Sequence, residues 1–183
     1  VTQYILTNAM GAAIKVIDFG AILTSVTAPD RNGKLADVVT GFDDMEGYLK
    51  PHGSMGETIG RYGNRIAKGR FTIDGETYQL AINNGENHLH GGTGGFHRVF
   101  YRVEELADGV RMSAVSPDGE DGYPGTLAHS VTYRVTERTL HIEFSARSDR
   151  DTVWAPTSHI YFNMDGEVGD AVSNRLTIYA DAY

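Results

Sequence analysis

Histidines stand beside small or glycine-rich neighbours in two segments of the chain, where they could carry proton transfer. His88 and His90 lie two residues apart in a polar stretch that continues into the glycine-rich residues 91–95. His159 follows two small hydroxyl residues and precedes an aromatic pair. A histidine with an unperturbed pKa of about 6.5 can give or take a proton near neutrality. The glycines keep space open around His90, whereas His88 can be a structural histidine that donates to a loop carbonyl, and His159 can be a core histidine.

Arginine and asparagine side chains in residues 59–69 could bind the hydroxyl groups of a ligand. Asn64 and Arg65 stand among glycines, which let a ligand or another stretch of backbone approach closely. The planar guanidinium and the amide suit paired hydrogen bonds to hydroxyl oxygens. Arg61 and Arg65 can each also be a charge on the solvated surface.

Metal sites are a competing hypothesis for two segments. The spacing of His88 and His90 is that of a cupin metal site, but glycines follow instead of the carboxylate that such a site needs nearby. Residues 116–125 hold three carboxylates, yet they lack the flanking helices and the alternate acidic positions of an EF-hand. Proline and glycine make that segment foremost a rigid turn. We therefore predict no metal ligands.

Short strands joined by tight turns are the elements that must position these side chains. Asp74-Gly75 lies between alternating apolar and polar residues, which is the pattern of a two-residue hairpin. Period-two alternation of this kind predicts strands in residues 70–80, 101–115, 131–146 and 175–180. Residues 43–49 hint at one short helix. Many short strands with tight turns predict an all-β fold, an antiparallel β-sandwich or barrel.

Composition and charge bound the class of protein. The 183 residues include no cysteine, which excludes a disulfide framework and thiolate chemistry. The net charge of -8 disfavours nucleic acid and anionic membrane surfaces as partners but not a neutral small molecule. No apolar run approaches the ~18 residues of a membrane span, and no signal peptide is visible. We expect a single domain over residues 1–183 and a cytoplasmic location.

Taken together, the motifs resemble those of the aldose 1-epimerase (galactose mutarotase) family over nearly the whole chain. Each motif is weak by itself, but their joint order and spacing are specific. They lie at residues 19–22, 40–43, 59–61, 64–66, 89–92, 94–96, 116–119, 122–125 and 158–163.

The resemblance implies a large antiparallel β-sandwich, the galactose mutarotase-like supersandwich, with a sugar in an open cleft. It implies that Arg65, with Asn64, binds sugar hydroxyls. It implies that His90 contacts the substrate near its ring oxygen and that His159 is the general acid that protonates this oxygen. The family usually has asparagine where this chain has Ser158, which could alter the hydrogen bonding of that loop.

The implied reaction interconverts the α and β anomers of a free aldohexose such as galactose or glucose. A base takes the proton of the anomeric hydroxyl, an acid protonates the ring oxygen, and the ring closes again on the other face. A positioned acid or base contributes roughly 10² to 10⁴ in rate. Because the open-chain aldehyde is stable, no cofactor is expected.

The general base of the family is a glutamate in its C-terminal third, and a substrate-binding aspartate also lies beyond the last residue here. We therefore expect the sandwich to be incomplete, the base to lie outside these 183 residues, and the chain alone to be inactive. The chain can be a piece of a longer enzyme, or one half of a split enzyme that a second chain completes. It can also be a non-catalytic sugar-binding or sensor protein. An epimerase for hexose 6-phosphates is a further alternative, and would need a basic cluster such as Arg61, Arg65, Lys68 and Arg70.

Overall fold

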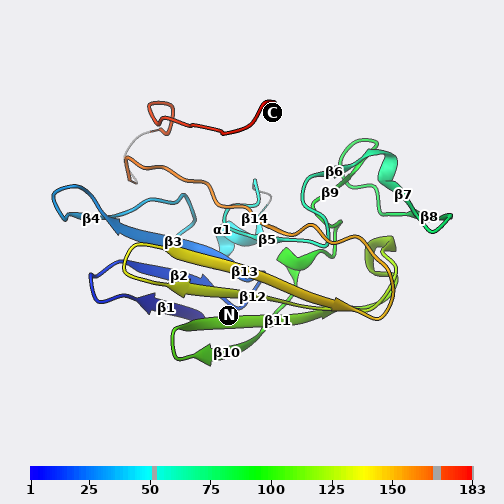
Figure 1. Ribbon diagram of the computed structural model, residues 1–183, viewed down its shortest axis with the longest axis horizontal. Coiled ribbons are helices and arrows are strands. Elements are labelled where there is room, and N and C mark those ends of the chain that lie inside the picture. The colour runs from blue at the N-terminus through cyan, green and yellow to red at the C-terminus, as the bar shows by residue number, and fades with distance from the viewer. Residues whose placement is uncertain (51–52, 167–169, 183) are drawn as a thin grey trace.

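Two four-stranded antiparallel sheets form the body of the protein in the computed structural model, which describes residues 1–50, 53–166 and 170–182 (Figure 1). The first sheet has the order β1-β2-β3-β4, with bounds Gln3–Thr7, Ala13–Ile17, Ile22–Pro29 and Leu35–Asp37. The second has the order β10-β11-β12-β13, with bounds Arg102–Leu106, Gly109–Ser116, Leu127–Val135 and Leu140–Ser148. Consecutive strands pair in both sheets, so hairpin connections build each of them.

Alternation along the strands places apolar side chains from both sheets in one core. In the second sheet Val110 and Met112 of β11 are fully buried. They pack with Ile14 and Leu23 of the first sheet in a shared hydrophobic cluster. Tyr133 is buried in this cluster, and its hydroxyl donates a hydrogen bond to the Ala21 carbonyl, just before β3. The sheets therefore pack face to face, which confirms the predicted antiparallel β-sandwich.

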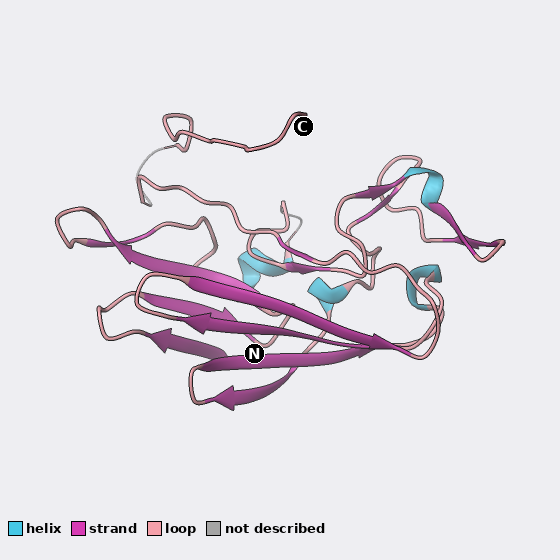
Figure 2. Ribbon diagram, viewed as in Figure 1, coloured by secondary structure: helices cyan, strands magenta, loops and turns pink. Residues whose placement is uncertain are grey.

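Short strands gather along one side of the sandwich and carry the loops that hold the predicted site residues (Figure 2). They form three two-stranded sheets: β5 (Thr58–Ile59) with β14 (Thr157–Ser158), β6 (Arg65–Ile66) with β9 (His88–Leu89), and β7 (Arg70–Ile73) with β8 (Glu76–Gln79). Helical structure among the described residues is limited to α1 (Met45–Leu49) and three short 3₁₀ turns, at Ala67–Gly69, Phe96–Arg98 and Glu120–Gly122. No helix in the described part of the chain is long and apolar enough to span a membrane.

The predicted hairpins are confirmed, and one predicted strand is wrong. Strands β7 and β8 turn at Asp74-Gly75, where both residues have positive φ, as a type I′ turn requires. The short helix α1 begins after Asp44, whose carboxylate caps it. Residues 175–180 form no strand, because no described segment pairs with them and their side chains are exposed. A period-two pattern does not show whether another segment is available to form the backbone hydrogen bonds of a strand.

His129 of β12 makes stability depend on pH. Its ring stacks on Phe96 at 3.6 Å between centroids, and burial, followed by the charge of Arg61, lowers its pKa to about 4. The unfolded chain has a histidine pKa of about 6.5, so it binds the proton more readily than the folded chain does. The free energy of unfolding is therefore highest above about pH 6.5, and falls by about 3 kcal/mol as the pH drops toward 4.

Replacing His129 by phenylalanine should flatten this dependence, because the stacked ring stays while the titrating group is removed. Urea unfolding at pH 7, 5.5 and 4.5 measures the effect. The matched control is His141→Phe, at an exposed histidine of β13, which should keep the slope of the parent. An unchanged slope in His129→Phe would show that another group causes the acid sensitivity.

Candidate active site

An open cleft of ≈ 630 Å³ brings together the four side chains that the sequence singled out, Asn64, Arg65, His90 and His159. Its other lining residues are Gly63, Ala155, Thr157, Ser158 and Ile160. A volume of this order lies within the roughly 300–1,000 Å³ of small-molecule sites. Three segments that are distant in sequence thus meet at one place, while the role of each side chain stays a prediction.

The β6–β9 ribbon places Asn64 and His90 opposite each other. Arg65 pairs with Leu89 in the ribbon, so the two site residues lie just beyond its last pair. The His90 backbone N–H donates to the Asn64 carbonyl at 3.1 Å, and the Asn64 backbone N–H donates to His90 Nδ1 at 3.0 Å. Both residues have positive φ, 66° and 54°. Backbone in this sparsely populated region is typical of functional sites, where the surrounding structure holds it.

The bond from Asn64 fixes the protonation state of His90. Because Nδ1 accepts this hydrogen bond, it carries no proton, and the proton of the neutral ring lies on Nε2. Burial lowers the pKa of His90, and the nearby His159 and Arg65 lower it further. At neutral pH the ring is therefore uncharged and offers an N–H donor at Nε2, which is the group needed to bind an uncharged oxygen.

Arg65 is oriented by an asparagine on the neighbouring loop. Its Nε donates to Asn84 Oδ1 at 2.9 Å, and a terminal nitrogen donates to Asn64 Oδ1 at 3.3 Å. These bonds use two of the five N–H donors of the guanidinium and leave three for a ligand in the cleft. No sequence motif pointed to this role of Asn84.

His159 is held by the backbone on both sides. Its N–H donates to the Glu57 carbonyl at 2.9 Å, and its carbonyl accepts from the Gly56 N–H at 2.9 Å. The ring stands edge-on to His90 at 5.0 Å between centroids, and Tyr161 packs on it at 5.2 Å. One ligand resting against this pair of imidazoles can therefore contact both.

Arg61 is a buried structural residue, which corrects the hypothesis of a surface charge. Its side chain is almost fully buried. Its five N–H groups reach six acceptors, Ser116 Oγ, Thr152 Oγ1 and the carbonyls of Ser116, Pro117, Pro124 and Gly125, so one N–H is shared between two acceptors. The sequence held one signal for this role, the proline- and glycine-rich turn whose carbonyls need donors.

His88 is also structural. Its Nδ1 lies 2.7 Å from the Ala81 carbonyl, which can only accept, so Nδ1 carries the proton. Its Nε2 then accepts from the Tyr123 hydroxyl at 2.6 Å. With both ring nitrogens engaged, His88 has no lone pair for a cupin-type metal, and the structural interpretation of this histidine holds.

The carboxylates of residues 116–125 bind protein donors. Asp118 accepts from the Gly125 N–H, Glu120 accepts from the Ser116 hydroxyl, and Asp121 accepts from Thr93 and Gly94. This is the rigid turn that the prolines and glycines predicted. Among the described residues, no group of three or more histidines or carboxylates is arranged to hold a metal ion.

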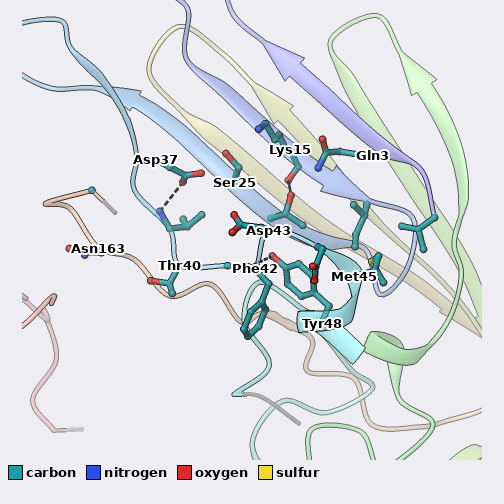
Figure 3. Close-up of a pocket in the computed structure, with 17 residues that line it drawn as sticks. Gln3, Lys15, Ser25, Asp37, Thr40, Phe42, Asp43, Met45, Tyr48 and Asn163 are labelled. Atoms are coloured by element: carbon teal, nitrogen blue, oxygen red, sulfur yellow. Dashed lines mark hydrogen bonds between the residues drawn. The ribbon is translucent and has the colours of Figure 1, made fainter. Parts of the chain in front are cut away.

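A second cleft of the same volume, ≈ 630 Å³, lies between the first sheet and the loop before α1 (Figure 3). It contains none of the predicted site residues. Lys15, Asp37 and Asp43 line it. Asp37 Oδ1 accepts the backbone N–H groups of Val26 and Val39, so this carboxylate holds local structure. The charged lining suits a neutral ligand less well than the histidine-bearing cleft does.

The fold and the first cleft together define a class of protein. It is an antiparallel β-sandwich whose open cleft presents two imidazoles, a guanidinium and an amide. These groups suit hydroxyl-bearing ligands and proton transfer.

The chain belongs to the aldose 1-epimerase family, whose sequence model matches residues 2–183. It is 44% identical to a galactose mutarotase from Bos taurus over 171 residues, which is 93% of this chain and 50% of that protein. It is 37% identical to an aldose 1-epimerase from Escherichia coli over 180 residues, 97% of this chain and 52% of that protein. The crystal structure of an aldose epimerase homologue from C. elegans superposes with a TM-score of 0.85 at 37% identity, covering 90% of this chain and 51% of that chain.

The chain spans about half the length of the curated relatives it matches. In those relatives the remaining length belongs to the same polypeptide. The comparisons therefore do not support a second chain that supplies the closing strands.

Proposed function

We propose that this chain supplies the general acid and the sugar-binding side chains of an aldose 1-epimerase site. The observation that carries the proposal is the convergence of Asn64, Arg65, His90 and His159 on one cleft. Galactose mutarotase and aldose 1-epimerase relatives at 37–44% identity support the same activity. The substrate is a free aldohexose such as galactose or glucose, and we propose that the protein acts in the cytoplasm.

The geometry supports a division of labour between the two histidines. His90 is neutral and donates from Nε2, so it holds the sugar near its ring oxygen without transferring a proton. His159, whose ring lies edge-on beside that of His90, protonates that oxygen as the sugar ring opens. Arg65 and Asn64 bind the hydroxyls and fix the sugar ring against the two imidazoles. The reaction requires no cofactor, because the open-chain aldehyde that forms is stable.

The general base is proposed to lie outside these residues. No carboxylate of the described chain lines the cleft. We therefore expect the 183 residues alone to bind galactose without accelerating mutarotation. Activity should appear in a protein that joins this chain to the half of the Bos taurus galactose mutarotase that it does not match, hereafter the joined protein.

Polarimetry of freshly dissolved α-D-galactose tests the proposal, with the joined protein and the 183 residues compared at equal concentration. Mutarotation that the joined protein accelerates and the 183 residues do not would support the proposal. A folded joined protein that leaves the spontaneous rate unchanged would refute the enzyme and leave the sugar-binding or sensor protein as the better account.

The alternative of a hexose 6-phosphate epimerase needs several basic side chains in the cleft, and Arg61 and Arg70 do not line it. All the donor atoms of Arg61 are used inside the protein. Arg70 lies in β7, bonds Gln79, and does not line the cleft. Arg65 is thus the single arginine among the lining residues described, which suits a neutral sugar better than a phosphate dianion.

Replacing Arg65 by lysine should weaken galactose binding by about 10- to 100-fold, because an ammonium cannot reproduce a planar guanidinium fork. The measurement is the dissociation constant from an NMR titration of the 183 residues. Arg70→Lys is the matched control, since Arg70 Nε also donates to a side-chain amide, Gln79, but outside the cleft. Equal affinities for the two variants would remove Arg65 from the binding site.

A further inference from the structure

One carboxylate, that of Asp121, holds the glycine-rich loop that follows His90. Asp121 Oδ1 accepts from the Thr93 N–H at 3.0 Å and from its hydroxyl at 3.3 Å, and Oδ2 accepts from the Gly94 N–H at 2.9 Å. Two successive backbone N–H groups thus converge on one anion. A Cβ on Gly92 would lie 2.3 Å from Asp121 Cγ, so glycine is needed there for the loop to come this close.

The protein around Asp121 is itself well fixed. The Asp121 carbonyl accepts from the Ala81 N–H at 2.9 Å, and the Gly119 N–H donates to the Tyr123 carbonyl at 2.8 Å. Arg61 binds four carbonyls of the same turn. The Asp121 carboxylate therefore connects the loop to a densely hydrogen-bonded part of the fold.

Residues 91–95 need such a connection because four of the five are glycine. Glycine loses more backbone freedom on ordering than any other residue, so a free loop of this kind samples many conformations. The loop is pinned near its ends, where the Gly92 N–H donates to the Leu89 carbonyl and the Phe96 N–H donates to the Gly60 carbonyl. The bonds to Asp121 hold its middle.

His90 immediately precedes this loop, so the position of the loop decides where the His90 imidazole lies. His90 has a φ of 54°, which the chain keeps only while both neighbouring segments are fixed. Its ring is set by one hydrogen bond, from the Asn64 N–H to Nδ1 at 3.0 Å. A shift of the loop would lengthen that bond and allow the proton to sit on either ring nitrogen.

We propose that Asp121 is a positioning residue: through residues 91–95 it holds His90 in one tautomer and one orientation toward the sugar. Asp121 does not line the cleft, so it acts without touching the ligand. The sugar-binding part of this inference rests on the proposed function, whereas the effect on the His90 tautomer does not.

Asp121→Asn tests the inference with little change to the backbone. Asn tolerates the positive φ of position 121, 51°, but leaves one acceptor oxygen and turns an amide N–H toward a backbone N–H. Long-range ¹H–¹⁵N spectra of the imidazoles should show His90 protonated on Nε2 in the parent and exchanging between tautomers in the variant. The galactose dissociation constant should rise about threefold to tenfold.

Asp30→Asn is the matched control. Asp30 Oδ1 accepts the N–H groups of Asn32 and Lys34 at 2.8 and 2.9 Å, the same kind of two-amide contact, in the turn between β3 and β4 at the far end of the molecule from β6 and β9 (Figure 1). This variant should leave the His90 signals and the galactose affinity as in the parent.

Two results would overturn the inference. One is a folded Asp121→Asn variant in which the Thr93 and Gly94 amides shift while His90 keeps the parent tautomer. The other concerns Gly92→Ala, which pushes the loop away but keeps the carboxylate, and which serves if Asp121→Asn does not fold. Parent-like His90 signals in Gly92→Ala would also refute it. If the parent binds no galactose, the proposed function fails, and the tautomer comparison still decides the role of Asp121.

Discussion

Replacing His159 by asparagine in the joined protein is expected to lower the kcat of galactose mutarotation by about 10²- to 10⁴-fold, the usual contribution of a positioned acid. The His159 ring stands edge-on to the His90 ring, with 5.0 Å between the centroids. The backbone N–H and carbonyl of His159 are both hydrogen-bonded. Asparagine can still donate a hydrogen bond to the ring oxygen but cannot transfer a proton at neutral pH. KM should therefore change much less than kcat, because the loss falls on the transition state.

The control for this prediction is His141→Asn, at an exposed histidine of β13 whose loss should leave both constants unchanged. Polarimetry over a range of galactose concentrations separates kcat from KM. A His159→Asn protein with the parent kcat would move the general acid elsewhere. A rise in KM alone would make His159 a binding residue.

Local patterns predicted the hairpins within residues 70–80, 101–115 and 131–146, but not the strands of the first sheet or the partner of every strand. The Asp74-Gly75 hairpin follows from residues adjacent in sequence, so the structure reproduces it. Residues 175–180 show the same alternation without forming a strand, because pairing depends on a neighbour that no local pattern reveals. That residues 1–183 form a single domain stays a prediction.

The sequence indicated the four candidate site residues but not the residues that hold them in position. Motif order indicated Asn64, Arg65, His90 and His159, and the structure places all four at one cleft. Asn84 and Asp121 act through hydrogen bonds between loops 19 to 28 residues apart, and no spacing rule identifies such pairs. The burial of Arg61 had only the proline- and glycine-rich turn as a signal, and an arginine among glycines can also be a ligand-binding or a surface residue.

Replacing Arg61 by methionine is expected to lower the free energy of unfolding by about 3–5 kcal/mol, comparable to breaking a buried charged network. Arg61 is 2% exposed, and its guanidinium donates to four backbone carbonyls of residues 116–125. Methionine fills much of the volume but leaves those acceptors without donors, each at a cost of about 1–3 kcal/mol. Domains of this size are typically stable by only about 5–15 kcal/mol, so the variant will be marginal or unfolded.

Urea unfolding measures the loss, with Arg111→Met as the matched control. Arg111 pairs with Glu104 at 3.3 Å on the exposed face of the second sheet, a contact that should contribute less than about 1 kcal/mol. Arg61→Lys separates charge from geometry, because a lysine keeps the charge but cannot reach all the acceptors that the planar fork reaches. If Arg61→Met is too unstable to measure, the lysine variant should still unfold at clearly lower urea than Arg111→Met. Parent-like stability of both Arg61 variants would mean that residues 116–125 keep their conformation without the buried guanidinium. The position of Asp121 beside the loop that follows His90 would then not depend on Arg61.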